Sequence, residues 1–161
     1  DRDRAQLCEL GCRFIEHPRA KDETDLELAL RHAAKAGARE IVILGALGGR
    51  LDHTLSNVLL LALPDLAGIT VRLVDGLWVA MLARCGERVS LEGSRGELVS
   101  LLPLGGDVHG VTTRGLAWAL EGETLAFGFS RGVSNEMVGL RAEIGVDEGT
   151  LLVVHHEAAA G

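Results

Sequence analysis

The pattern of apolar residues changes near Asp75 and Gly76, and this change limits the folds that the 161-residue chain can adopt. Before it, segments with apolar residues at helical spacing alternate with short β-branched runs. After it, short strand-like runs are separated by glycine-rich turns. The first pattern is typical of parallel strands joined by helices, and the second of an antiparallel sandwich or barrel. We therefore predict an α/β domain over residues 1–76, followed by an all-β, β-sandwich-like or barrel-like domain over residues 77–161.

The α/β part carries clear helix and strand signals. Thr24 followed by Glu27 forms the capping-box pattern that begins a helix. The run "EIVILG", residues 40–45, is β-branched and apolar, as in a strand buried on both faces. In chain order we expect a helix over 4–10, a strand over 12–17, a helix from Thr24 to Gly37, a strand over 40–45, a helix from Leu51 to near Pro64 and a strand over 69–75.

The second part contains a series of short strands, and many of the 21 glycines of the chain lie in the turns between them. The polar, glycine-containing stretch "SRGVSNE", residues 130–136, is expected to form a loop rather than a strand. We expect strands over 77–83, 87–92, 98–104, 110–115, 123–129, 140–146 and 150–156.

The composition argues against several classes of function. A net charge of −7 does not suit broad binding to nucleic-acid backbones, and 3% aromatic residues provide few platforms for stacking on single strands. No apolar run approaches the length of a membrane span, so we expect no membrane partner. The sparse cysteines Cys8, Cys12 and Cys85 suit a reducing compartment, which predicts a cytoplasmic protein in which they pack rather than bind metal.

The stretch "KDETD", residues 21–25, lies between a predicted strand and the start of a predicted helix. An α/β sheet commonly binds its ligand where strands give way to helices. Asp22 and Asp25 flank Thr24 there, and carboxylates in such a place can hold Mg²⁺, which prefers oxygen ligands. The alternative is that both acids only complement the helix dipole, because negative charge stabilises a helix N-terminus.

The stretch "LGGRLDHTLSN", residues 47–57, occupies the next junction between a strand and a helix. Gly48 and Gly49 allow the backbone to approach a ligand closely, and amides at a helix N-terminus attract phosphate oxygens. Arg50 offers a planar fork for phosphate, while Asp52 and His53 border the same turn. The alternative is a tight turn with an arginine at the surface.

Two stretches in the β part are candidates for binding a small ligand. Trp118 is one of only two tryptophans in the chain, and Ser134 and Asn135 lie in the predicted loop over 130–136. The alternatives are a half-buried tryptophan on a strand and polar residues that cap a turn.

Together these stretches resemble the thiamine pyrophosphokinase family. The matching pieces, "KDETD", "GGRLDHTLSN", "VTTRGLAWAL" and "SRGVSNEM", occur in this order and span nearly all of the chain. The resemblance implies ATP-dependent, Mg²⁺-dependent transfer of diphosphate to the hydroxyl of thiamine, with AMP released. It also implies an α/β catalytic domain, a β-sandwich-like domain and a homodimer.

The resemblance also implies roles for the candidate residues. Asp22 and Asp25 would be catalytic, holding Mg²⁺ or orienting the reacting groups. Trp118, Ser134 and Asn135 would receive thiamine at the dimer interface. The nucleotide would be bound by Thr24, Gly48, Gly49, Arg50, Asp52 and His53.

One departure from the family pattern lies at the start of the chain. The family carries an acidic "G-D-x-D-S"-like motif after an earlier strand, whereas this sequence begins with "DRDRAQ". Asp1 and Asp3 are preceded by no strand or glycine, so we do not expect them to replace that motif. We expect the native protein to be longer. Two alternatives to diphosphate transfer to thiamine remain. One is a related pyrophosphokinase for another hydroxymethyl heterocycle, such as a pterin. The other, which the missing motif leaves open, is a non-catalytic dimer that binds thiamine or a nucleotide.

Overall fold

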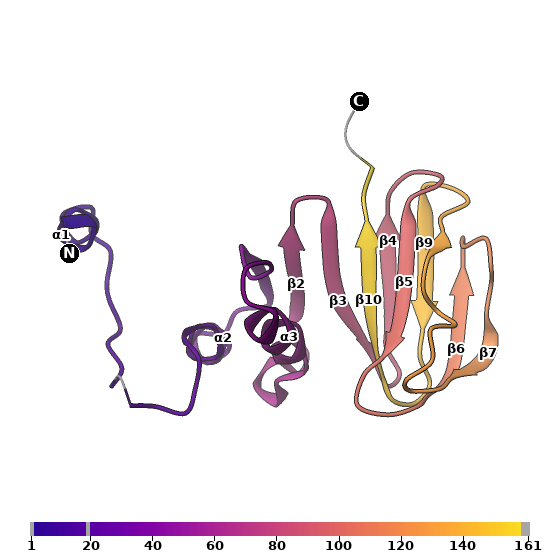
Figure 1. The fold of residues 1–161 in the computed structure, drawn as a ribbon, viewed down its shortest axis with the longest axis horizontal. Helices are drawn as coiled ribbons and strands as arrows, with labels where there is room; N and C mark the ends of the chain where they lie inside the picture. The colour runs from indigo at the N-terminus through magenta and orange to yellow at the C-terminus, as the bar shows by residue number, and fades with distance from the viewer. Residues whose placement is uncertain (1, 19, 159–161) are drawn as a thin grey trace.

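The computed structural model describes residues 2–18 and 20–158. Its helices are α1 (Arg2–Glu9), α2 (Asp25–Lys35) and α3 (Leu51–Leu59), with short 3-10 turns η1 (Leu60–Ala62) and η2 (Pro64–Leu66). Its strands are β1 (Glu40–Leu44), β2 (Thr70–Asp75), β3 (Trp78–Arg84), β4 (Arg88–Glu92), β5 (Leu98–Pro103), β6 (Val108–Arg114), β7 (Glu121–Leu125), β8 (Asn135–Glu136), β9 (Arg141–Gly145) and β10 (Thr150–His156). Figure 1 shows the helices at one end of the molecule and β6 and β7 at the other.

The strands form two sheets. The six-stranded sheet has the order β1-β2-β3-β10-β5-β8, and the four-stranded sheet has the order β4-β9-β6-β7. β1 and β2 are parallel, with α3 in their connection, while the other strand pairs are antiparallel. The predicted order, α/β first and all-β second, is therefore confirmed. The six-stranded sheet also continues across the predicted boundary, because Leu73 of β2 pairs with Ala80 of β3.

The apolar core consists of two clusters that use opposite faces of the six-stranded sheet. On β10, Leu151 and Val153 join the cluster between the two sheets, together with Ile144 of β9. The intervening Leu152 joins the cluster that contains Leu30 of α2. Side chains alternate between the two faces of a strand, so β10 belongs to both clusters and connects the α/β part to the sandwich.

Helix α2 begins as the sequence predicts. The Thr24 hydroxyl accepts a hydrogen bond from the backbone N–H of Glu27 at 3.2 Å, which caps the N-terminus. Leu30 is 2% exposed and anchors the helix in the core. Among the described residues, no helix is both long and apolar enough to cross a membrane.

Four local predictions were wrong. Strand β1 was predicted to be buried on both faces, but only one face is buried, because Val42 is 48% and Leu44 is 72% exposed. Residues 12–17 form no strand: they are exposed, and no strand of either described sheet pairs with them, so their backbone lacks the ladder that a strand requires. Strand β7 ends at Leu125 rather than near Phe129, because the chain turns at Gly128 with φ of 84°. The predicted loop over 130–136 contains the short strand β8, which pairs with β5.

Candidate functional site

The glycine-rich loop after β1 turns the chain sharply into α3. Gly48 and Gly49 have φ of 92° and 68°, in the left-handed region that residues with a Cβ rarely adopt. Two side chains of α3 hold the loop. The N–H of Gly48 donates to Thr54 Oγ1 at 3.2 Å, and Asn57 Nδ2 donates to the carbonyl of Ala46 at 2.7 Å. The predicted loop therefore follows a parallel strand and precedes a helix N-terminus, an arrangement suited to phosphate oxygens.

The Arg50 side chain is bound to Asp52. Arg50 Nε donates to Asp52 Oδ1 at 3.1 Å, and Nη2 donates to Oδ2 at 2.5 Å. The hydrogen bonds from Arg50 lower the pKa of Asp52, and the N–H of His53 also donates to this carboxylate. Arg50 is 72% exposed, so solvent can replace Asp52 at little cost. A phosphate could therefore replace Asp52 as the hydrogen-bond partner of the Arg50 guanidinium.

At the start of α2, Asp25 and Lys21 form an ion pair. The hydrogen bond and charge of Lys21 lower the pKa of Asp25, which keeps its carboxylate ionised. A hollow of about 490 Å³ borders this pair, lined by α2 and by the segment before it, including His17 and His32. Asp22 is exposed beside it. The predicted acids are thus available to a ligand, with Thr24 used as the helix cap.

The donor chemistry of this region fits Mg²⁺ in part. Within residues 2–18 and 20–158, no group of three or more His, Cys, Asp or Glu side chains is placed to hold a metal ion. Mg²⁺ commonly uses one or two carboxylates and completes its shell with water and substrate phosphates, which Asp22 and Asp25 would allow. Metal binding by these two residues stays a prediction. Asp1 and the side chain of Asp3 lie outside the described part of the chain.

Trp118 lies in the connection between β6 and β7 and is 61% exposed. The alternative of a half-buried tryptophan on a strand is therefore wrong. Trp118 borders a hollow of about 400 Å³ that is also lined by Leu101, Ala119, Leu120, Arg131, Gly132 and Asn135. An exposed indole at the edge of a small hollow can stack on a planar ligand.

Asn135 also lines this hollow but is only 7% exposed. Its Oδ1 accepts from the backbone N–H of Trp118 at 3.1 Å and from that of Glu136 at 2.9 Å. Its Nδ2 donates to the carbonyl of Trp118 at 2.7 Å. The amide of Asn135 thus holds both backbone polar groups of Trp118.

Ser134 is exposed, and its φ of 62° places it in the left-handed region. Among the described residues it is the only non-glycine residue with positive φ. Its backbone N–H donates to Ser100 Oγ of β5 at 3.1 Å. Backbone strain of this kind often marks functional sites.

Some site residues were not predicted. Arg131 borders the hollow next to Trp118 and forms an ion pair with Glu123, and Ser100 supports Ser134. Nothing in the sequence around Ser100 distinguishes it from any other strand serine. Asn57, by contrast, lies in the glycine-rich stretch itself, in the helix that directly follows the loop, and this position could have suggested a contact with the loop.

The two groups of predicted residues lie far apart in one chain. The glycine-rich loop follows β1, which is the first strand of the six-stranded sheet, and Asn135 is in β8, which is the last. Five strand spacings of about 4.8 Å separate these edges by roughly 24 Å. The structure therefore does not bring the predicted nucleotide-binding residues together with Trp118 within one molecule.

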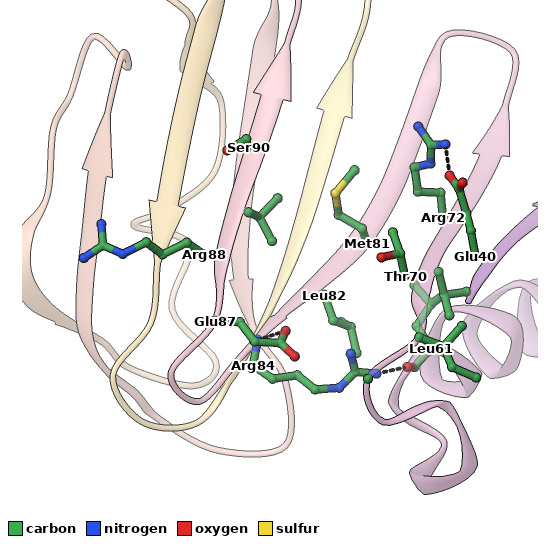
Figure 2. Close-up of a pocket in the computed structure, with 14 residues that line it drawn as sticks. Glu40, Leu61, Thr70, Arg72, Met81, Leu82, Arg84, Glu87, Arg88 and Ser90 are labelled. Atoms are coloured by element: carbon green, nitrogen blue, oxygen red, sulfur yellow. Dashed lines mark hydrogen bonds and ion pairs between the residues drawn. The ribbon is translucent and has the colours of Figure 1, made fainter. Parts of the chain in front are cut away.

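A third hollow, of about 530 Å³, lies where the α/β part meets the sandwich and is shown in Figure 2. Arg84 of β3 donates to the carbonyl of Leu61 at 2.8 Å across its floor, and Arg72 pairs with Glu40 at its rim. No predicted site residue lines it. Arg72 is paired with Glu40, and Glu87 accepts from the backbone N–H of Arg84 at 3.0 Å. The contact of Arg84 with Leu61 ties the two parts of the chain together.

Two family models match the chain one after the other. Residues 1–73 match the thiamin pyrophosphokinase catalytic domain, and residues 88–151 match the thiamin pyrophosphokinase vitamin B1 binding domain. The first match contains the acidic and glycine-rich stretches, and the second contains Trp118, Ser134 and Asn135.

Individual proteins similar to this chain have the same family name as the two domain models. Thiamine pyrophosphokinase of Bacillus subtilis is 31% identical over 134 residues, which cover 83% of this chain and 63% of that protein. Thiamine pyrophosphokinase 1 of Arabidopsis thaliana is 32% identical over 138 residues, which cover 78% of this chain and 50% of that protein. The chain thus spans between half and two thirds of the length of these relatives.

Solved structures share the fold. The crystal structure of thiamine pyrophosphokinase from Bacillus subtilis aligns with a TM-score of 0.86 at 26% identity, covering 98% of this chain and 73% of that one. The structure from Geobacillus thermodenitrificans aligns with a TM-score of 0.80 at 26% identity, covering 99% and 73%. Since both domain models match in succession and the whole fold agrees, this chain belongs to the thiamin pyrophosphokinase family.

Proposed function

We propose that the protein transfers diphosphate from ATP to the hydroxyl group of thiamine, giving thiamine diphosphate and AMP. The observation that carries this proposal is the pairing of a glycine-rich loop at a helix N-terminus with a second site around an exposed tryptophan, in the order of the two family domains. The first site suits a nucleotide and the second suits a planar cation.

The chain would bind ATP through its loop after β1. Backbone N–H groups at the N-terminus of α3 would face phosphate oxygens, and the Arg50 guanidinium would exchange its Asp52 partner for phosphate. Asp52 would then orient the nucleotide, with His53 beside it. Thr54 and Asn57 keep the loop in shape during this exchange.

In the reaction, the thiamine hydroxyl oxygen forms a bond to the β-phosphorus of ATP. The bond from that phosphorus to the oxygen bridging it to the α-phosphorus breaks, and the hydroxyl proton leaves to solvent or a carboxylate. Mg²⁺ held by Asp22 and Asp25 would neutralise phosphate charge. The remaining catalytic effect comes from positioning, which dominates phosphoryl transfer.

We further propose a homodimer in which each site is shared. Within one chain, roughly 24 Å of sheet separates the glycine-rich loop from Asn135, so a partner chain must supply the thiamine side. Exposed apolar side chains at the connections before and after β7 support an interface there. These are Trp118, Phe127, Phe129 and Val133, which are 44–73% exposed.

A complementation experiment tests both proposals. Arg50→Ala and Trp118→Ala variants of the full-length gene product are each assayed for AMP release from ATP, Mg²⁺ and thiamine, then mixed and allowed to exchange subunits. Half of the randomly mixed dimers carry one intact site, so about a quarter of wild-type activity should return. Activity that never exceeds the sum of the two variants would exclude a shared site. Wild-type protein that binds thiamine without releasing AMP would favour a non-catalytic dimer, and turnover of a hydroxymethylpterin alone would favour the other acceptor.

We also propose a cytoplasmic location. Cys8, Cys12 and Cys85 are all free and exposed, so the prediction that they pack was wrong. Exposed thiols of this kind persist in reducing compartments, which supports the proposal. Fractionation of source cells, with the protein found in the cytosolic fraction, is the direct measurement.

A further inference from the structure

In the connection between β6 and β7, the backbone of Trp118 is bound by one buried side chain, that of Asn135. Asn135 is 7% exposed, whereas Trp118 is 61% exposed. The Asn135 amide accepts from the N–H of Trp118 and donates to its carbonyl, at 3.1 and 2.7 Å. These bonds use three of the four hydrogen-bonding positions of the amide once the bond from Glu136 N–H is included. Asn135 is thus committed mainly to backbone.

Asn135 is itself fixed by β5. It pairs with Val99 in the six-stranded sheet, and just before it the carbonyl of Gly132 accepts from the N–H of Leu101 at 2.8 Å. A Cβ at Gly132 would lie 2.2 Å from the carbonyl oxygen of Leu101, so this segment packs directly on the strand. The position of Asn135 is therefore set by a rigid element of the core.

Between these two anchors the backbone passes through a strained residue. Ser134 has φ of 62°, in the left-handed region that residues with a side chain rarely adopt. Its N–H would lose its protein partner if Ser100 lacked its hydroxyl, because Ser100 Oγ accepts that N–H at 3.1 Å. Ser100 therefore supports the turn that aims Asn135 at Trp118.

We propose that Ser100 and Asn135 are positioning residues, which hold the backbone of Trp118 so that its indole is ready to stack on the acceptor before the acceptor arrives. This inference rests on the proposed function, since it assigns the acceptor to Trp118. The contacts run from Ser100 of β5 through Ser134 and Asn135 to Trp118. A preorganised ring binds more tightly, because the loop loses less freedom on binding.

The fluorescence of Trp118 can report directly on the exposure of its own ring. The chain contains two tryptophans, so a Trp78→Phe background leaves Trp118 as the single indole. In that background we compare Ser100→Ala, Ser100→Thr, Asn135→Ala and, as a matched control on another strand, Ser90→Ala. For each full-length protein we measure acrylamide quenching of the ligand-free tryptophan emission, KM for thiamine, KM for ATP and kcat.

We expect Ser100→Ala to increase quenching of Trp118 in the ligand-free protein and to raise KM for thiamine about fivefold, the effect of losing one hydrogen bond. Asn135→Ala should increase the quenching of Trp118 further and should raise KM for thiamine about tenfold or more. KM for ATP and kcat at saturating thiamine should stay within about twofold of the values for the Trp78→Phe background, because the position of the ring affects thiamine binding and not the chemical step. Ser100→Thr keeps the acceptor oxygen and should restore both readouts, and Ser90→Ala should change neither.

Two results would overturn the proposal. If Asn135→Ala weakens thiamine binding but leaves the ligand-free Trp118 emission and quenching unchanged, Asn135 contacts the ligand and does not position the ring. If Ser100→Ala lowers only the melting temperature, Ser100 is merely structural. The quenching experiment needs no substrate, so it remains decisive for positioning even if the wild-type protein releases no AMP, a result that would count against the proposed function alone.

Discussion

His155 Nε2 lies 2.7 Å from Glu97 Oε2, and both side chains are buried at the end of β10. Burial alone would raise the pKa of Glu97. Hydrogen bonds from the backbone N–H groups of Ala158 and Ser94, and from His155, outweigh it, so the pKa is lowered from its usual 4.5. The pair joins β10 to the start of β5, which is the strand that supports Asn135.

Acid should therefore weaken the fold through Glu97. A carboxylate whose pKa is lower in the folded state stabilises that state above the unfolded pKa of 4.5, and this stability is lost as the pH falls through the lower folded value. Glu97→Gln should cost about 1–3 kcal/mol at pH 7, where His155 and Ala158 lose a charged acceptor. Thermal unfolding is measured from pH 7 to pH 3, and the melting temperatures of the wild type and of Glu97→Gln should become equal in acid. A constant difference at every pH would contradict the assignment.

Asp25→Asn should keep the fold and remove most of the diphosphate transfer, by at least about tenfold, because a hard-cation site loses charge. Asp25 is almost fully exposed, so the melting temperature should not change. AMP release is measured over a Mg²⁺ titration, with Asp65→Asn in η2 as the matched control. Near-normal release at low Mg²⁺ would remove Asp25 from the metal site.

Arg50→Lys should weaken ATP binding by roughly tenfold, since a point charge replaces a fork that contacts two oxygens. The fork geometry is visible in its two bonds to Asp52. Calorimetry with a non-hydrolysable ATP analogue measures the change, and Arg141→Lys is the control because Arg141 forms an equally exposed ion pair with Glu92. Equal affinity in the wild type and in Arg50→Lys would make Arg50 an ordinary surface residue.

Local signals in the sequence predicted local structure well. Thr24 and Glu27 lie three residues apart, so the helix cap that they form depends on no other part of the chain. The strand predicted over 12–17 was wrong for the opposite reason, since a strand exists only where a partner pairs with it. The seven strands expected after residue 76 all have counterparts, but their order in the sheets was not predictable from spacing. β10, the last strand, pairs with β3 and β5 in the middle of the six-stranded sheet.

The part of the candidate site that is built from neighbouring residues was predicted, and the part that depends on distant residues was not. Gly48, Gly49 and Arg50 could be recognised because a loop that binds phosphate is built from neighbouring residues. The hydrogen bonds between Asn135 and Trp118 join residues 17 positions apart in the sequence. The hydrogen bond between Ser134 and Ser100 joins residues 34 positions apart. Such contacts depend on how strands pair, so only the structure reveals them.

Ser134→Gly separates backbone strain from ligand contact. Glycine adopts a φ of 62° without the cost that serine bears, so this variant should be at least as stable as the wild type. Ser134→Ala keeps the strain and loses only the hydroxyl. If that hydroxyl contacts thiamine, both variants should raise KM for thiamine by a similar factor, about fivefold. Differential scanning calorimetry and steady-state kinetics give the two readouts. Unchanged KM in both would leave Ser134 with a backbone role only.

Trp118→Ala should raise the dissociation constant for thiamine about tenfold or more, because a cation–π contact contributes roughly 0.5–2 kcal/mol and the ring also provides apolar contact. Trp118→Phe should retain part of the affinity. The affinity for ATP, measured separately, should stay the same, since the glycine-rich loop lies at the other edge of the six-stranded sheet. Because Trp118 is 61% exposed, neither variant should lose much thermal stability, and Trp78→Phe is the matched control. A folded Trp118→Ala protein that binds thiamine as tightly as the wild type would exclude stacking on this ring.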